Sequence, residues 1–326
     1  MNSGAWFSPT IFLHTDELRP YMNSLAEEQN SQRFLDLAAA KSHLYSLTDK
    51  LQTAQIALLV FNALVWPPLL AWKPNLTVWS AFSAFVIPLA EVSVLEPLQQ
   101  RWKVCAAKIQ EQFDCTLFRL VWNDLKVGPK AREENIARYA SAYRKHRADD
   151  AALRDWYSFD FSDLPVSHAR LICQRANAWW DTELRSNYSA LINWSIVVLS
   201  LLALITAIAT GLTVEKFILA VVAPLTPICL WALKETKKQS RVAAGGVRVV
   251  EHLESAWASL CNGTTSEGEV DSISRSLQDE IFERRSENAV NPQWLYGKKR
   301  EQFQKLMIAA ANQLLSDYRA AKTGQC

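Results

Sequence analysis

The sequence has few glycines and lacks the short motifs of common enzyme families. Nine glycines in 326 residues are typical of a mostly helical chain, because glycine is concentrated in turns. The patterns GxxxxGK[ST], GxGxxG, HExxH and GxSxG are all absent. Phosphate-binding loops, dinucleotide sites, zinc proteases and serine hydrolases of these types therefore have no support. We expect the chain not to be an enzyme and to carry no cofactor.

The cysteines and histidines form no recognisable pattern either. Six cysteines and five histidines are scattered, with no CxxC pair and no Cys/His cluster. We interpret the cysteines as reduced thiols in a reducing compartment and predict no metal site. The first 50 residues lack a basic segment followed by a short apolar core, so no cleavable signal peptide is expected.

Neither sign of charge is in large excess. The net charge of +2 and a pI near 8.2 give no basic footprint for DNA or RNA, so neither is expected as a partner. The mean hydropathy of −0.06 is average for a soluble protein. That average conceals a division between polar regions and long apolar segments.

Four apolar segments occur in two close pairs. They span residues 53–72, 76–95, 190–212 and 217–233, and Glu91 is the one charged residue among them. A helix that crosses a bilayer needs about 20 such residues, and two tight pairs are hard to bury in a soluble protein of this size. The sequence therefore predicts an all-α membrane protein with four transmembrane helices in two hairpins plus a helical cytoplasmic domain.

Basic residues predict the orientation of these hairpins. The expected parts are an N-terminal cytoplasmic helix (1–52), a first hairpin (53–99), a central cytoplasmic region (100–188), a second hairpin (189–233) and a C-terminal cytoplasmic region (234–326). Lysine and arginine together number 4, 1, 15, 1 and 14 in these parts. By the positive-inside rule, both termini and the central region lie in the cytoplasm.

The cytoplasmic regions show helical spacing of apolar residues. Helices are expected over residues 25–52, over 134–146, from Val166 into the third span, and from Gln293 to about Arg319. The pair Gly245-Gly246 is interpreted as a helix break or flexible joint.

Polar residues inside the spans are candidates for function. Gln55, Glu91 and Asn193 are expected at similar depth near the cytoplasmic side, and Asn62 lies nearer the middle. Together they could line a water path through the membrane. The alternative is that Glu91 reaches the headgroups or an arginine, and that the amides bond between helices.

Two prolines in the fourth span, Pro224 and Pro227, are candidates for a gate hinge. Proline removes a helical hydrogen bond and kinks the helix, although prolines are common in membrane helices in general. Ala203, Ala207 and Gly211 form a ridge of small residues in the third span. This ridge suits either an oligomer contact or packing within the hairpin.

One polar stretch combines arginines with aromatic residues just before the third span. Arginine and aromatic rings can hold a phosphorylated base by ion pairing and stacking. The alternative is that these residues anchor a helix at the headgroups. The candidate ligand-sensing residues are Arg154, Trp156, Arg170, Arg175, Trp179 and Trp180.

Several stretches resemble the bacterial SMODS-associated four-transmembrane effector family. The resemblance rests on "AAKIQEQFDC" from Ala106, "LVWN" from Leu120, "LRDWY" from Leu153, "ARLICQRANAWWDTELR" from Ala169 and "LQDEIFERRSENAVNPQWLY" from Leu277. It implies a pore-forming effector of antiphage defence in the bacterial inner membrane, activated by a cyclic oligonucleotide that a nucleotidyltransferase makes. No functional residue is carried over from the family.

A pore would need several copies of the chain, because one bundle of four helices has no room for a wide water path. A homo-oligomer in the lipid bilayer is therefore expected. The main alternative is a membrane scaffold or sensor that recruits a cytoplasmic partner without forming a pore. A small transporter would need more polar positions deep in the spans, and a membrane enzyme would need the missing catalytic motifs.

Overall fold

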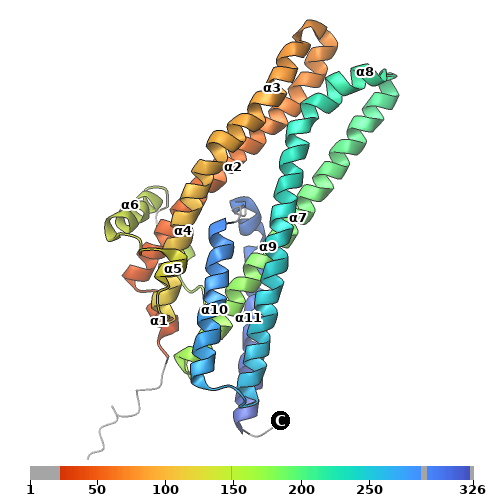
Figure 1. Cartoon of the computed structure of the whole chain (residues 1–326). Coiled ribbons are helices and arrows are strands. Elements are labelled where there is room, and N and C mark those ends of the chain that lie inside the picture. The colour runs from red at the N-terminus through yellow and green to blue at the C-terminus, as the bar shows by residue number, and fades with distance from the viewer. Residues whose placement is uncertain (1–22, 148, 288–291, 324–326) are drawn as a thin grey trace, which may run out of the picture.

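Four long helices carry the apolar segments in the computed structural model (Figure 1), which describes residues 23–147, 149–287 and 292–323. Two are single α-helices and two contain a short π-helical turn. They are α2 (Gln32–Trp72), α3 (Thr77–Ala90) continued by the π turn Glu91–Leu95 into α4 (Glu96–Leu117), α7 (Val166–Thr210), and α8 (Val214–Phe217) continued by the π turn Ile218–Val222 into α9 (Ala223–Cys261).

Two short turns join these helices into hairpins at one end of the molecule (Figure 1). The first turn contains the 3₁₀ segment Pro74–Leu76. In the second, Gly211 ends α7 with φ at +64°, a left-handed conformation that favours glycine. The Thr213 side chain then accepts a hydrogen bond from the Lys216 backbone amide and caps α8. These local signals explain why the chain reverses where the apolar segments end.

The hairpins leave their apolar side chains uncovered. Only 6% of the most apolar window of α7 is buried, and 11% of the corresponding window of α3 and α4. A soluble monomer rarely exposes an apolar surface of this extent. Four helices are long and apolar enough to cross a bilayer, so the protein is a multi-pass membrane protein and the exposed surface faces lipid.

The other ends of the long helices are wrapped by shorter ones to form a helical body (Figure 1). No strand occurs among the described residues, and the predicted all-α fold with four spanning helices is confirmed. Buried leucines and aromatic residues from α2, α4 and α7 form the centre of the body. The shorter elements are α1 (Leu25–Glu28), α5 (Asp124–Val127), α6 (Glu133–Arg144), the 3₁₀ turn Ala151–Leu153, α10 (Glu267–Glu287) and α11 (Gln293–Thr323).

Most of the helices expected in the body are confirmed. The helix predicted over residues 134–146 is α6, the one starting at Val166 is α7, and the one starting at Gln293 is α11. The helix predicted from Leu25 is divided, because α1 ends at Glu28 and α2 begins at Gln32. A turn at residues 29–31 therefore separates α1 from α2.

The predicted break at Gly245-Gly246 is wrong. Both glycines lie inside the continuous helix α9 and are buried. A Cβ atom at Gly246 would overlap the Thr182 hydroxyl and the Arg284 guanidinium. Glycine is present here because α9 passes very close to α7 and α10, and not because the helix ends.

Candidate ligand-binding cavity

A cavity of about 500 Å³ lies in the body, below the membrane-spanning segments. Its walls come from α2, α4, α7, α10 and α11 and from the loop after α6. The volume is typical of sites for small molecules and cofactors. Elements from both halves of the chain therefore meet around one space that a ligand can occupy.

Basic side chains outnumber acidic ones around this cavity. Two carboxylates, Asp114 and Asp181, line it. An excess of fixed positive charge in a concave site attracts anionic ligands. The basic residues are Lys41, Lys50, Arg147, Arg185, Arg285 and Arg300, with His43 and His146 beside them.

Lys41 is a basic residue of the cavity wall that lies against an aromatic ring. Its ammonium group lies 5.6 Å from the centre of the Phe113 ring. Burial lowers the pKa of Lys41 to about 8, with the nearby Asp114 carboxylate opposing this effect. No carboxylate lies within ion-pair distance of Lys41 in the described part of the chain. An anionic ligand beside Lys41 would stabilise its charged form, because the ligand would replace the solvation that burial removes.

Aromatic rings form one wall of the same cavity. The rings of Trp156 and Trp180 have centres 4.9 Å apart, and Tyr296 lies 5.8 Å from Trp180. Asn177 fixes this wall, because it accepts a hydrogen bond of 3.0 Å from the Trp156 indole and donates one of 2.7 Å to the Tyr157 hydroxyl. Flat rings beside fixed cations suit a ligand that contains both bases and phosphates.

A buried polar network holds Arg285 at the edge of the cavity. Arg285 pairs with the buried carboxylate of Asp114 on α4. Gln278, two turns earlier on α10, donates hydrogen bonds to Asp114 at 3.2 Å and to Glu111 at 2.7 Å. Because Asp114 has partners on both turns of α10, Arg285 is positioned by contacts and not only by its own rotamer preference.

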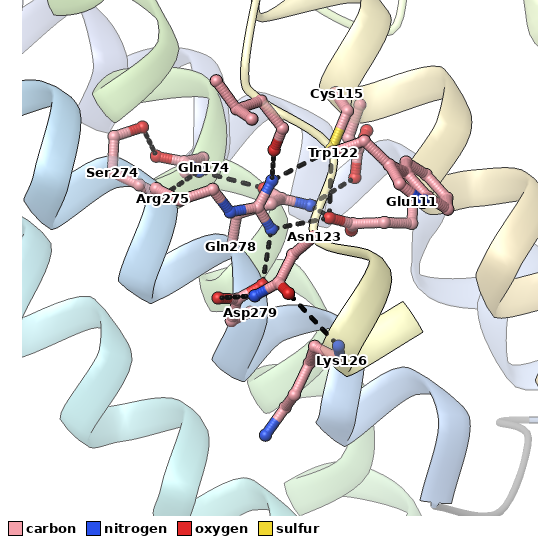
Figure 2. Close-up of polar contacts among 12 residues, drawn as sticks. Glu111, Cys115, Trp122, Asn123, Lys126, Gln174, Ser274, Arg275, Gln278 and Asp279 are labelled. Carbon is pink, nitrogen blue, oxygen red and sulfur yellow. Dashed lines mark hydrogen bonds and ion pairs between the residues drawn. The ribbon is translucent and has the colours of Figure 1, made fainter. Parts of the chain in front are cut away.

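Arg275 is the centre of this network (Figure 2). It donates to Glu111 at 2.8 Å and to Asp279 at 2.7 Å. Gln174 of α7 joins from the other side, with a hydrogen bond of 2.9 Å to Gln278. The network therefore links α4, α7 and α10 through buried hydrogen bonds and ion pairs.

A second set of hydrogen bonds leads from the cavity toward the membrane. Arg185 lines the cavity and bonds Asp181 at 2.8 Å. It also donates a bond of 2.9 Å to Gln239 on α9, which in turn donates one of 2.8 Å to Glu235. Glu235 lies two residues beyond the fourth apolar segment. Contacts made at Arg185 are therefore connected to the base of a membrane-spanning helix.

Comparisons with known proteins agree with this architecture. Residues 23–314 match the family model described as the SMODS-associating 4TM effector domain. The chain belongs to the SMODS-associating 4TM effector family. A Bacillus cereus protein named "Probable CBASS effector molecule" is 24% identical over 295 residues, which cover 87% of this chain and 96% of that relative. No solved structure gives a significant match.

The structure brings two of the six predicted ligand-sensing residues of this 4TM effector into the cavity. Trp156 and Trp180 line it. Trp179 instead packs against Phe303 with ring centres 5.7 Å apart, and Arg154 is exposed outside the cavity.

The other two predicted arginines are engaged elsewhere in the body. Arg170 pairs with Asp271 and donates to the Phe118 carbonyl at 3.4 Å. Arg175 pairs with Glu254 at 2.7 Å. Both project from faces of α7 that meet other helices. The basic residues of the cavity on α2, α10 and α11 were missed, because they are separated from one another in the sequence and no local motif marks them.

The four predicted pore-lining residues have two different environments. Gln55, Asn62 and Glu91 are buried between helices, and Gln99 donates a hydrogen bond of 2.9 Å to Gln55. Asn193 is exposed on the surface of α7. Within one chain, therefore, three of these side chains lie together on the packed side of the spans and Asn193 lies apart.

Asn62 joins the two hairpins inside the membrane. Its side chain donates to the Pro224 carbonyl at 3.2 Å and accepts from the Ser83 hydroxyl at 2.8 Å and the Trp66 indole at 2.9 Å. Pro224 lies two residues after the end of the π turn and Pro227 lies about one turn later. Prolines and π turns both disturb the regular helical hydrogen bonds. The candidate hinge is therefore the point where α9 is held by the first hairpin.

Proposed function

We propose that this 4TM effector is a membrane effector of bacterial antiphage defence, which opens a pore when an anionic nucleotide binds in the body cavity. The observation that carries the proposal is a cavity that combines six basic side chains with an aromatic wall. The name of the Bacillus cereus relative adds support, since it describes that protein as a CBASS effector. The ligand class we propose is a cyclic oligonucleotide.

Ligand binding would act by shifting an equilibrium between closed and open arrangements of the spans. Phosphates near Arg185 would compete for the hydrogen bonds that it makes with Asp181 and Gln239. Because Gln239 and Glu235 lie on α9 just below its span, a change in these bonds would alter how α9 enters the membrane. The hydrogen bond between Asn62 and the Pro224 carbonyl is one contact that such a movement would strain.

The open state would be a homo-oligomer in the inner membrane, with both termini and the body in the cytoplasm. Lysine and arginine are concentrated outside the hairpins, which favours this orientation. The described chain begins and ends at the body, on the side away from both hairpin turns (Figure 1). Gln55, Asn62 and Glu91 are the polar side chains that a pore through these hairpins would expose, and Asn193 would join them only from a neighbouring copy.

Membrane potential in living cells tests the proposal. We expect a voltage-sensitive dye to report depolarisation when the protein is induced together with a cyclic-nucleotide synthase, and a steady potential when either is induced alone. Depolarisation that does not depend on the synthase would contradict ligand control. A steady potential both with and without the synthase, with the protein shown to be inserted, would favour a scaffold that forms no pore.

The Glu91→Ala variant tests the pore path. A carboxylate beside a narrow water path attracts cations, so the ratio of cation to anion permeability should fall toward one. The reversal potential across a planar bilayer under a salt gradient measures this ratio. Glu96→Ala is the matched control, because Glu96 is an exposed carboxylate five residues further along. Equal reversal potentials in the wild type and Glu91→Ala would remove Glu91 from the path.

A further inference from the structure

A second cavity, of about 330 Å³, lies where three long helices enter their apolar segments. Its sides are residues 49–60 of α2 and 188–199 of α7, and its floor is residues 228–232 of α9. Pro292 and Trp294, at the start of α11, lie at the body end. The two sides belong to different hairpins, so the groove separates the hairpins on this face of the molecule.

The polarity of the groove changes along its length. Asp49, Gln52 and Tyr188 lie at the body end, where Gln52 donates a hydrogen bond of 3.4 Å to the Tyr188 hydroxyl. Leucine, isoleucine and valine side chains line the part between the spans. The hydroxyl of Ser195 is satisfied within its own helix by the Leu191 carbonyl at 2.9 Å. A ligand that is polar at one end and apolar along the rest of its length matches this change in polarity.

The groove opens on the surface that faces lipid. Val60 and Leu191 both line it and are 36% and 42% exposed. An apolar cavity does not hold water, because water finds no hydrogen-bond partners there. Leaving it empty would forfeit the dispersion contacts of every side chain around it. Hydrocarbon from the bilayer is the material in direct contact with the opening.

We propose that this groove binds one acyl chain of a phospholipid from the leaflet next to the body. A helix with its side chains is about 10 Å across, so a space of this volume suits a chain of methylene groups better than a helix of a second copy. Trp294, 55% exposed at the mouth, would lie at the headgroup level, where tryptophan is enriched. The lipid would fill the gap between α2 and α7 and contribute to holding the two hairpins together.

Photoreactive fatty acids test this site. Cells that express the full-length protein would be fed a diazirine fatty acid, which is incorporated into phospholipid. The protein would then be purified in detergent to remove loosely held lipid, irradiated, and mapped by mass spectrometry. We expect the retained crosslinks to fall on groove residues such as Ile56, Ser195 and Trp231, and not on Val198, which is 53% exposed on the outer face of α7.

Two variants distinguish a bound lipid from general contact with the bilayer. Leu199→Trp fills the groove and should reduce the groove crosslinks at least fivefold, whereas Val198→Trp, the adjacent residue facing outward, should leave them unchanged. Circular dichroism would check that both variants keep their helices. Crosslinks spread evenly over exposed span residues, an equal yield from both variants, or no retained crosslink would each overturn the proposal. A disulfide between two chains through Leu199→Cys, with no lipid crosslink, would assign the groove to a second copy.

Discussion

The Lys41→Met variant should lose the response to the activating nucleotide while keeping or gaining thermal stability. Lys41 lines the cavity, has no carboxylate within ion-pair distance among the described residues, and its pKa is lowered to about 8 by burial. Removing this charge relieves a desolvation cost in the free protein. In the complex it removes a charge-assisted hydrogen bond worth about 1.5–3 kcal/mol, so affinity should fall by about 10- to 100-fold.

Ligand binding and melting temperature, measured on the purified protein, check this prediction together. Lys305→Met is the matched control, because Lys305 is an exposed lysine outside the cavity that pairs with Glu301. A variant that merely unfolds would lose both binding and stability. Unchanged affinity in Lys41→Met would exclude Lys41 from the ligand site.

The pH dependence of Lys41 gives a further check on the same residue. Its folded pKa lies below the unfolded value of about 10.4, so the unfolded chain holds more protons between the two values. The contribution of Lys41 to stability therefore rises as the pH rises from about 8 to 10.4. The wild type should gain stability over this range relative to Lys41→Met. The affinity for the anionic ligand should fall as the pH rises over the same range, because neutral Lys41 no longer attracts phosphate.

The Gly246→Ala variant should strongly destabilise the body. The added methyl group would overlap Thr182 and the guanidinium of Arg284, and overpacking of this kind costs about 1–3 kcal/mol or more. Arg284 can move aside only by giving up its ion pair with Asp181, which lines the cavity. We therefore expect a lower melting temperature together with weaker ligand binding.

Gly245→Ala is the control for this prediction. At Gly245 a Cβ atom would meet Arg248 and Arg284 at 3.7 Å or more, which is ordinary contact. Alanine is favoured over glycine inside a helix by about 0.5–1 kcal/mol, so this variant should be neutral or more stable in thermal melting. If the two variants melted at the same temperature, the close approach of α9 to α7 would be refuted.

The membrane-spanning helices could be predicted from the sequence because hydropathy is a local property. Each pair of apolar runs, with the short turn between them, lies within about 50 consecutive residues. Such a pair can be recognised without knowing which other segments it contacts. The start of α7 at Val166 was found for the same reason, since Pro165 precedes it directly.

The cavity could not be predicted in the same way, because its residues meet only in the folded chain. Lys41 of α2 and Arg300 of α11 are far apart in sequence and line one space. The predicted arginine-rich stretch includes the start of α7, which forms part of the cavity wall, but Arg170 and Arg175 contact other helices. Asn177, Trp180 and Asp181 face the cavity, whereas Arg170 faces α10.

The glycine pair was misread for a related reason. A glycine that permits a close helix crossing and a glycine that ends a helix look identical until the neighbouring helix is known. Only the positions of Thr182 and Arg284 show which role Gly246 has.

Leakage from liposomes tests the central claim most directly. Purified protein would be reconstituted into vesicles loaded with a self-quenching dye, and a panel of synthetic cyclic di- and trinucleotides would be added one at a time. We predict that at least one nucleotide releases dye through the wild type and through Lys305→Met, but not through Lys41→Met at the same concentration. Equal release from Lys41→Met, or no release from the wild type with any nucleotide of the panel, would contradict a pore controlled from this cavity.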